Sequence, residues 1–181
     1  MNDAPIPRFT RRAATVATLG WLTGAHAVEP PAPLPDLGPA VEFTGIDRWL
    51  GSEPLTMQGR RGQVTLVYFW TFGCVNCLNT MPHVVRWYER YRDRGFAVVG
   101  VHTPEFAFER VTASVEAARD RLGIRFPVAQ DNRFATWQAW RNQYWPAFYL
   151  VDRAGRVRRR HFGEGEYAQM DAAIQSLLAT G

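Results

Sequence analysis

The sequence predicts an α/β fold in which helices cover both faces of a central mixed β-sheet. Two runs, 64–70 and 96–101, are almost continuously apolar, which is typical of parallel strands that are buried on both faces. Helical segments alternate with these runs, and a turn-linked pair of strands and a helix close the chain. The 181 residues, 46% of them hydrophobic, suit one globular domain with a sizeable core.

The start of the chain resembles an export signal, which we assign to residues 1–27. Arginines within residues 8–12 form a charged head, residues 13–22 are weakly apolar, and residues 25–27 fit the small-x-small cleavage pattern. An uncleaved membrane anchor is the alternative, but such an anchor needs about 20 apolar residues. We therefore expect cleavage near Ala27.

A proline-rich stretch, 28–40, follows the leader. So many prolines predict a stiff, extended spacer, and the folded domain is expected over residues 41–181. Export would deliver the chain to an oxidising compartment, where two cysteines normally stay paired. A reactive pair there needs its own source of oxidant or reductant.

The first half of the domain is predicted to form the sheet centre. Residues 41–58 carry two short apolar pieces around a turn signal, which indicates a β-hairpin ahead of the strand 64–70. A helix should run from Cys74 to Arg94, end at Gly95 and kink at Pro82.

The second half of the domain is predicted to contain three helical segments and three short strands. We expect a helical stretch from Thr103 to Gly123, a strand at 126–129, a helix at 133–143, strands at 147–151 and 156–162, and a helix at 166–178. Asn132 is expected to cap the helix that follows it.

Cys74 and Cys77 are the only cysteines, and they lie between a predicted strand and a predicted helix. A Cys-x-x-Cys at such a junction is typical of a thiol–disulfide active site. The helix N-terminus lowers the pKa of the first thiol, and the second thiol is on the same helix face, where it can close the ring.

A structural staple and half a zinc site are the alternatives. A disulfide loop this short constrains the unfolded chain little. A zinc site needs two more ligands at close spacing, and the four histidines form no such pair: His26, His83, His102 and His161. We therefore expect redox chemistry and no metal.

Charge gives no support to a role with nucleic acid. The formal net charge is +4, and it falls to +2 when the three arginines and one acid of residues 1–27 are removed. The run 156–160 is the one basic cluster; it is expected to be a solvated edge strand, with a docking patch for a partner as the alternative.

Four stretches give the chain a resemblance to a known family. They are Phe-Trp-Thr-Phe-Gly-Cys-Val-Asn-Cys at 69–77, Val-His-Thr-Pro-Glu-Phe at 101–106, Gln-Tyr-Trp-Pro-Ala at 143–147 and Gly-Glu-Gly-Glu-Tyr at 163–167. With the order of elements, they resemble the thioredoxin superfamily, in particular its exported TlpA-like branch and the thioredoxin-like domain of DipZ-type cytochrome c biogenesis proteins. The resemblance implies a thioredoxin-like three-layer sandwich with a central mixed β-sheet, an N-terminal β-hairpin and a helical insertion.

The resemblance also implies site residues. Cys74 would be the exposed nucleophile and Cys77 the resolving thiol, and the two would form a redox disulfide. Pro146 would be a cis proline that faces the cysteines. It would leave the Trp145 carbonyl free to pair with an extended partner.

Aromatic and histidine side chains are secondary candidates. A substrate-binding cleft is expected to be lined by Trp70, Trp145 and Tyr144. Simple core packing is an equally good alternative for Trp70. His83 is expected to pack in the core or at the surface rather than to act in catalysis, and His102, at a strand end, is a weaker candidate for catalysis.

Two positions depart from the family pattern, which leaves the proton acceptor of the resolving thiol open. Tyr68 stands where many thioredoxins have a buried Asp, and Gly73 where a Trp is usual. Tyrosine is not ionised at neutral pH. Glu105 is our candidate base, because two parallel strands should bring it to the sheet edge where Cys74 lies; capping of the following helix is the alternative for Glu105.

The predicted function is an exported, periplasmic thiol–disulfide oxidoreductase that reduces disulfides of envelope proteins, with a role in cytochrome c maturation implied by the resemblance. We expect the protein to need no metal or organic cofactor, to take electrons from a membrane-bound donor and to be a monomer. A thiol peroxidase is one alternative, because Thr71 and Cys74 match part of a peroxiredoxin site. A copper-binding envelope protein is the other.

Overall fold

A computed structural model describes residues 33–180 of the chain. These residues form a six-stranded mixed sheet in the order β1-β4-β3-β2-β5-β6. The predicted export signal, 1–27, lies outside the described residues. Within the described part, no helix has the length and apolar character to cross a membrane.

The sheet centre is built from the two predicted apolar runs. Strands β2 (Val64–Trp70) and β3 (Phe96–His102) pair in parallel, with Trp70 opposite His102. The short strand β4 (Val128–Gln130) extends the parallel part of the sheet. Antiparallel strands complete it: β5 (Ala147–Val151) beside β2, β6 (Val157–Phe162) beside β5, and β1 (Arg48–Leu50) beside β4.

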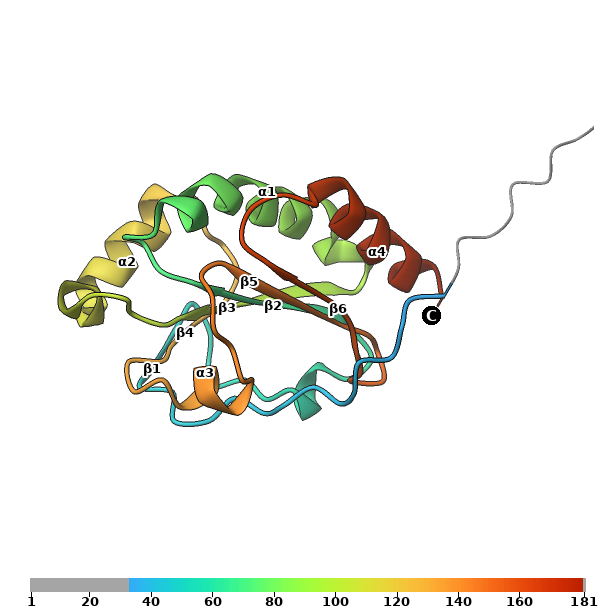
Figure 1. Ribbon diagram of the computed structural model, residues 1–181, viewed down its shortest axis with the longest axis horizontal. Helices are drawn as coiled ribbons and strands as arrows, with labels where there is room; N and C mark the ends of the chain where they lie inside the picture. Colours follow the sequence, from blue (N-terminus) through green and yellow to red (C-terminus); the bar gives the residue numbers. More distant parts are fainter. Residues whose placement is uncertain (1–32, 181) are drawn as a thin grey trace, which may run out of the picture. The chain divides into compact units, whose positions relative to one another are not determined.

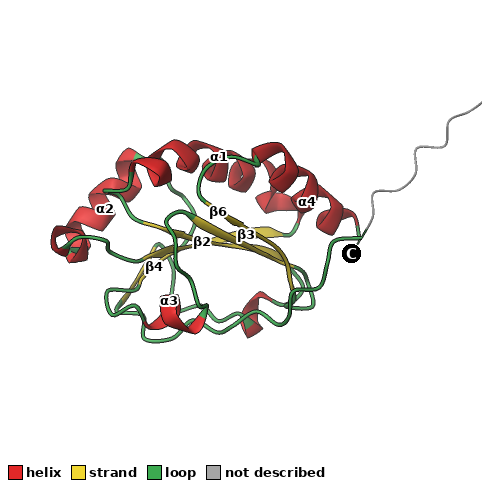
Figure 2. Ribbon diagram, in the orientation of Figure 1, coloured by secondary structure: helices red, strands yellow, loops and turns green. Residues whose placement is uncertain are grey.

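Helices cover both faces of this sheet, as Figure 1 shows. One layer contains α1 (Val75–Tyr91), α2 (Thr112–Arg121) and α4 (Tyr167–Ala179). The opposite layer is thin and contains α3 (Ala135–Ala139) and loop segments. Figure 2 shows helices and loops in different colours. The predicted three-layer, thioredoxin-like α/β fold is therefore confirmed.

Side chains of β2 alternate between two hydrophobic cores. Leu66 and Tyr68 belong to the core beneath α1 and α4, and Val67 and Phe69 belong to the core on the opposite face. Successive side chains of a strand point to opposite faces, so a strand that is covered on both sides must be apolar throughout.

Helix α1 ends as the sequence predicts. Pro82 lies inside it, and a short 3₁₀ helix (Arg92–Arg94) extends it to Gly95. Gly95 has φ 83°, a left-handed conformation that glycine adopts without steric cost.

The predicted N-terminal β-hairpin is wrong. Residues 48–50 pair with β4 instead, and the Glu42 carboxylate accepts the backbone N–H of Met57 at 2.6 Å. A side chain therefore takes the place of the strand ladder between the two apolar pieces. Part of the predicted spacer is also packed, since Leu37 donates to the Val157 carbonyl at 2.9 Å and Pro39 forms a bridge with Arg156.

Two predicted helices are shorter than expected. The stretch from Thr103 forms a loop and a 3₁₀ helix (Ala107–Arg110) before α2 begins, because the extended backbone of Val111 separates the two. Helix α3 ends at Ala139, and Arg141 then turns left-handed with φ 51°.

Asn132 does not cap α3. The neighbouring carboxylate, Asp131, accepts the backbone N–H of Thr136 at 3.2 Å and of Trp137 at 2.8 Å. The N-cap position itself is held by Phe134, which makes no side-chain cap, so the expected cap at Asn132 is wrong.

Candidate active site

Cys74 lies at the N-cap of α1, directly after the turn that follows β2. Its Sγ accepts the backbone N–H of Cys77 at 3.2 Å. Hydrogen bonding from the Cys77 side chain is the largest effect on Cys74, and it lowers the pKa of this thiol from 9.0 to about 7, against the opposing effects of burial and of the Glu105 charge. A thiol with such a pKa is about half thiolate at neutral pH, and the thiolate is the nucleophile.

Cys77 is a different kind of thiol. It is fully buried one turn inside α1, and burial raises its pKa far above the usual range. Both cysteines are free thiols in this structure. The Cys74 sulfur is therefore partly exposed and can attack as a thiolate. The Cys77 thiol stays protonated in its buried environment.

Tyr68 occupies the position beneath Cys77 where an acid is common. Its hydroxyl donates to the Cys77 carbonyl at 3.2 Å and forms a 2.7 Å hydrogen bond with Thr80. Burial raises the pKa of Tyr68 well above 10.0. Tyr68 thus stays protonated at neutral pH, as predicted, and it cannot accept the Cys77 proton.

The peptide bond between Trp145 and Pro146 is cis, as expected. Pro146 directly precedes β5, whose Ala147 pairs with Phe69 near the end of β2. The Trp145 indole packs on Trp137 at 4.1 Å between ring centroids, and its Nε1–H donates to the Thr103 carbonyl at 2.9 Å. This bond ties the cis-proline loop to the loop after β3.

The other two aromatic candidates differ in position. Trp70 is fully buried in the α1-side core and lies edge-on to His102, so it does not line a cleft. Tyr144 is 53% exposed and packs against Phe162. Of the three aromatic residues that were expected to line the cleft, Trp70 belongs instead to the core.

Glu109, which was not among the predicted site residues, binds the residue that precedes Cys74. Glu109 is fully buried, and its Oε1 accepts the Gly73 backbone N–H at 2.8 Å. Its Oε2 accepts the backbone N–H groups of Glu105 at 2.6 Å and of Phe106 at 2.8 Å. One carboxylate therefore joins the residue before the nucleophile to the loop after β3.

Glu109 also settles two questions about its neighbours. A side chain at Gly73 would overlap the Glu109 carboxylate, which explains why this position has no Trp. Glu105 does not cap the following turn, because Glu109 takes the free N–H groups there; Glu105 is itself exposed. Its charge raises the pKa of both cysteines, so it lies within electrostatic reach of them. The absence of a Trp before Cys74 was the sequence signal for a bulky neighbour.

The histidines behave as structural groups. The His83 ring stacks on Tyr167 at 3.7 Å. His102 is buried, pairs its Nε2 with the Thr71 hydroxyl at 3.2 Å, and has a pKa lowered to about 4 by burial. The Thr71 hydroxyl is thus directed to His102, which disfavours the arrangement of a peroxide site at Cys74.

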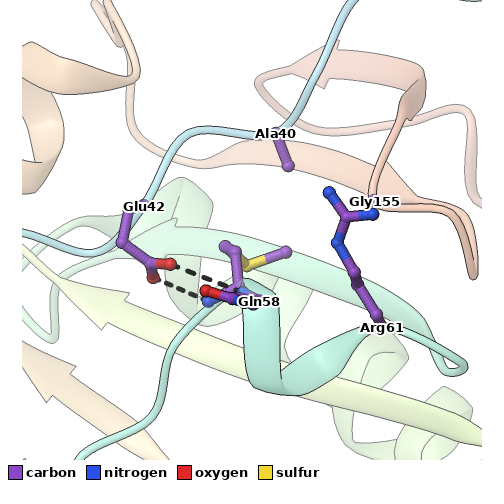
Figure 3. Close-up of a pocket in the computed structure, with 6 residues that line it drawn as sticks. Ala40, Glu42, Gln58, Arg61 and Gly155 are labelled. Atoms are coloured by element: carbon purple, nitrogen blue, oxygen red, sulfur yellow. Dashed lines mark hydrogen bonds between the residues drawn. The ribbon is translucent and has the colours of Figure 1, made fainter.

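One hollow of the described residues, of about 320 Å³, lies away from the dithiol. Figure 3 shows the residues that line it: Ala40, Glu42, Met57, Gln58, Arg61 and Gly155. Its carboxylate, Glu42, is occupied by the backbone of Met57 and Gln58. Among residues 33–180, no three His, Cys, Asp or Glu side chains are grouped as metal ligands.

The described residues form a mixed thioredoxin-like sheet with an asymmetric dithiol at the start of α1. The chain belongs to the AhpC/TSA family, whose pattern matches residues 39–160. The relatives described next confirm the predicted likeness to the DipZ type of thioredoxin-like protein.

Protein DipZ of Mycobacterium tuberculosis is 47% identical over 150 residues, which cover 81% of this chain and 22% of DipZ. The chain thus spans about a fifth of DipZ. Thiol-disulfide oxidoreductase YkuV of Bacillus subtilis is 28% identical, with 78% of this chain and 95% of YkuV covered. The solution structure of an oxidised thioredoxin-like protein superposes with a TM-score of 0.72 at 28% identity, covering 79% of this chain and 96% of the other.

Proposed function

We propose that this chain is a thiol–disulfide oxidoreductase that works outside the cytoplasm and reduces disulfides of envelope proteins. The observation that carries the proposal is the asymmetry of the dithiol. Cys74 has a pKa of about 7 and is partly exposed, whereas the pKa of the buried Cys77 is strongly raised. Such a pair can give two electrons to a partner in two separate steps.

In the first step, the Cys74 thiolate attacks one sulfur of the partner disulfide. A Cys74–partner disulfide forms, the partner's own S–S bond breaks, and the second partner sulfur leaves as a thiolate. In the second step, Cys77 loses its proton and attacks Cys74, which releases the partner dithiol and leaves the Cys74–Cys77 disulfide. We assign to the Trp145 carbonyl, beside Pro146, the backbone pairing that holds the extended partner.

Glu105 remains our candidate for the group that accepts the Cys77 proton. Its charge acts on both thiols, and its exposure lets it pass the proton to water. Replacement Glu105→Gln should slow the release of the mixed disulfide and change its pH dependence. An unchanged rate and pH profile would remove Glu105 from the mechanism.

The Cys74 pKa supports a reducing role. A value of about 7 is that of thioredoxin, a reductant, whereas the strong oxidant DsbA has about 3.5 because its thiolate is far more stabilised. The resemblance of the sequence to DipZ-type cytochrome c biogenesis proteins is our ground for proposing a place in cytochrome c maturation. The protein would then need a membrane-bound electron donor, and residues 1–27 would direct its export.

Trapping of the mixed disulfide tests the proposal. The reduced Cys77→Ser variant should form a stable covalent adduct with a disulfide-containing protein such as insulin, with one partner per chain by mass. Cys74→Ser should form none. If both single variants form equal adducts, or neither does, the assigned order of the two thiols is wrong.

A further inference from the structure

The loop after β3 presents aromatic side chains to solvent beside the nucleophile. Phe106 and Phe108 are 50% and 58% exposed, and their rings stack in parallel with centroids 5.7 Å apart. Phe108 also contacts Phe72, two residues before Cys74, at 5.9 Å between centroids. We call these three residues, Phe72, Phe106 and Phe108, the aromatic platform.

Glu109 attaches this platform to the active site. Its carboxylate binds the backbone N–H of Phe106 on one side and of Gly73 on the other, at 2.8 Å each. The Phe108 ring lies directly over Gly73, since a Cβ added there would be 3.5 Å from its Cζ. The platform is thus held in place before any partner arrives, which reduces the ordering cost of binding.

Adjacent exposed aromatic rings offer apolar area that a partner can remove from water, and contiguous apolar patches mark interaction sites. A partner that brings its sulfur to Cys74 must lie against the residues around Gly73, and therefore against the platform. Val75, directly after Cys74, adds an apolar side chain that is 66% exposed. An exposed carboxylate, Glu105, directly precedes Phe106.

We propose that the aromatic platform selects partner polypeptides whose cystine is flanked by apolar side chains, with Glu109 as the positioning residue. This inference rests on the proposed disulfide exchange at Cys74. Phe106 and Phe108 would cover the apolar neighbours of the reacting cystine, and the exchange rate would rise with the apolar area that they bury.

Single-turnover exchange with three disulfides tests this. Two cystine peptides of equal charge, one with Leu and one with Ser beside the cysteines, are compared with hydroxyethyl disulfide, which is too small to reach the platform. The wild-type protein should react about tenfold faster with the Leu peptide than with the Ser peptide. The Phe106→Ser/Phe108→Ser variant should lose this preference and keep the rate with hydroxyethyl disulfide.

Two further variants control the result. Phe106→Leu/Phe108→Leu keeps apolar area and should keep most of the preference. Leu37→Ser/Val41→Ser changes exposed apolar residues of the segment before β1 and should behave as wild type. An unchanged preference in the double Ser variant, or an equal loss in the Leu37/Val41 control, would overturn the inference.

The remaining outcomes separate the inference from its premise. If the wild-type protein does not react with hydroxyethyl disulfide, disulfide exchange at Cys74 fails and the inference fails with it. If the platform instead pairs two copies of this chain, sedimentation will show a wild-type dimer that Phe106→Ser/Phe108→Ser abolishes. That result would also overturn the selection of cystine partners.

Discussion

Removal of the Cys77 sulfur should raise the pKa of Cys74. The hydrogen bond from the Cys77 side chain is the largest effect that lowers this pKa from 9.0 to about 7. Cys77→Ala deletes that donor but keeps the backbone N–H of residue 77, which lies 3.2 Å from the Cys74 Sγ. The pKa should therefore return part of the way toward its ordinary value.

The thiolate fraction sets the magnitude. With a pKa of about 7, roughly half of Cys74 is thiolate at pH 7, and with a pKa of 9.0 the fraction is about 1%. Complete loss of the shift would thus slow alkylation at pH 7 by about 50-fold, which is the upper limit. Because the backbone donors of residues 76 and 77 remain, we expect a decrease of about three- to tenfold for Cys77→Ala.

Alkylation by iodoacetamide across a pH series measures this shift, with Cys74→Ser as the blank. Cys77→Ser is the matched control, because it also prevents disulfide closure but keeps an O–H donor. The pKa of Cys74 should increase from wild type through Cys77→Ser to Cys77→Ala. The three rates should converge at alkaline pH. Equal pKa values in wild type and Cys77→Ala would refute the assigned cause.

Three further predictions concern the residues around the dithiol. Tyr68→Phe removes the buried hydrogen bond to Thr80 and should lower the free energy of unfolding in urea by about 1–2 kcal/mol; an unchanged midpoint would contradict this. Gly73→Ala should cost about 1–3 kcal/mol through overlap with the Glu109 carboxylate, and the cost should shrink when Glu109→Ala is also present, whereas strict additivity would disprove the overlap. The ring resonances of His102, whose pKa is about 4, should stay unchanged from about pH 8 to about pH 5.5 in NMR titrations; a midpoint near the ordinary value would show that the ring is hydrated.

Local patterns made much of the fold predictable. Strands β2 and β3 are continuous apolar runs that are covered on both faces, and such runs have few other stable arrangements. The end of the helical segment that begins with α1 was predictable from Gly95, which adopts a left-handed conformation. The dithiol was equally clear, because Cys74 and Cys77 are close in sequence and stand at the start of a predicted helix. The pKa values of the two thiols were not predictable in this way, because they depend mainly on the Cys77 side chain and on burial.

Contacts that a sequence pattern does not show account for the failures. In place of the hairpin over 41–58, residues 48–50 pair with β4, and the Glu42 carboxylate accepts the N–H of Met57, 15 residues away in sequence. Asn132 was expected to cap a helix from residue 133, but the N-cap of α3 is Phe134, and the Asp131 carboxylate accepts the N–H groups of Thr136 and Trp137. The preference of Asn and Asp for helix starts could not predict this geometry.

Glu109 was missed for the same reason. It reaches back 36 residues to Gly73 as well as to its own turn, and only the fold brings these groups together. From sequence, Glu105 was the better candidate because it lies closer to the end of β3. In the structure, Glu109 accepts hydrogen bonds from the backbone of the loop, whereas Glu105 is exposed and within electrostatic reach of the thiols.

The equilibrium between the Cys74–Cys77 dithiol and glutathione tests the reducing role most directly. The protein is equilibrated with defined ratios of reduced and oxidised glutathione, and the fraction of the disulfide form is measured by mass after acid quenching. A reductant whose Cys74 pKa is about 7 should have a midpoint near that of thioredoxin, about −270 mV. A midpoint near that of DsbA, about −120 mV, would contradict the proposed function.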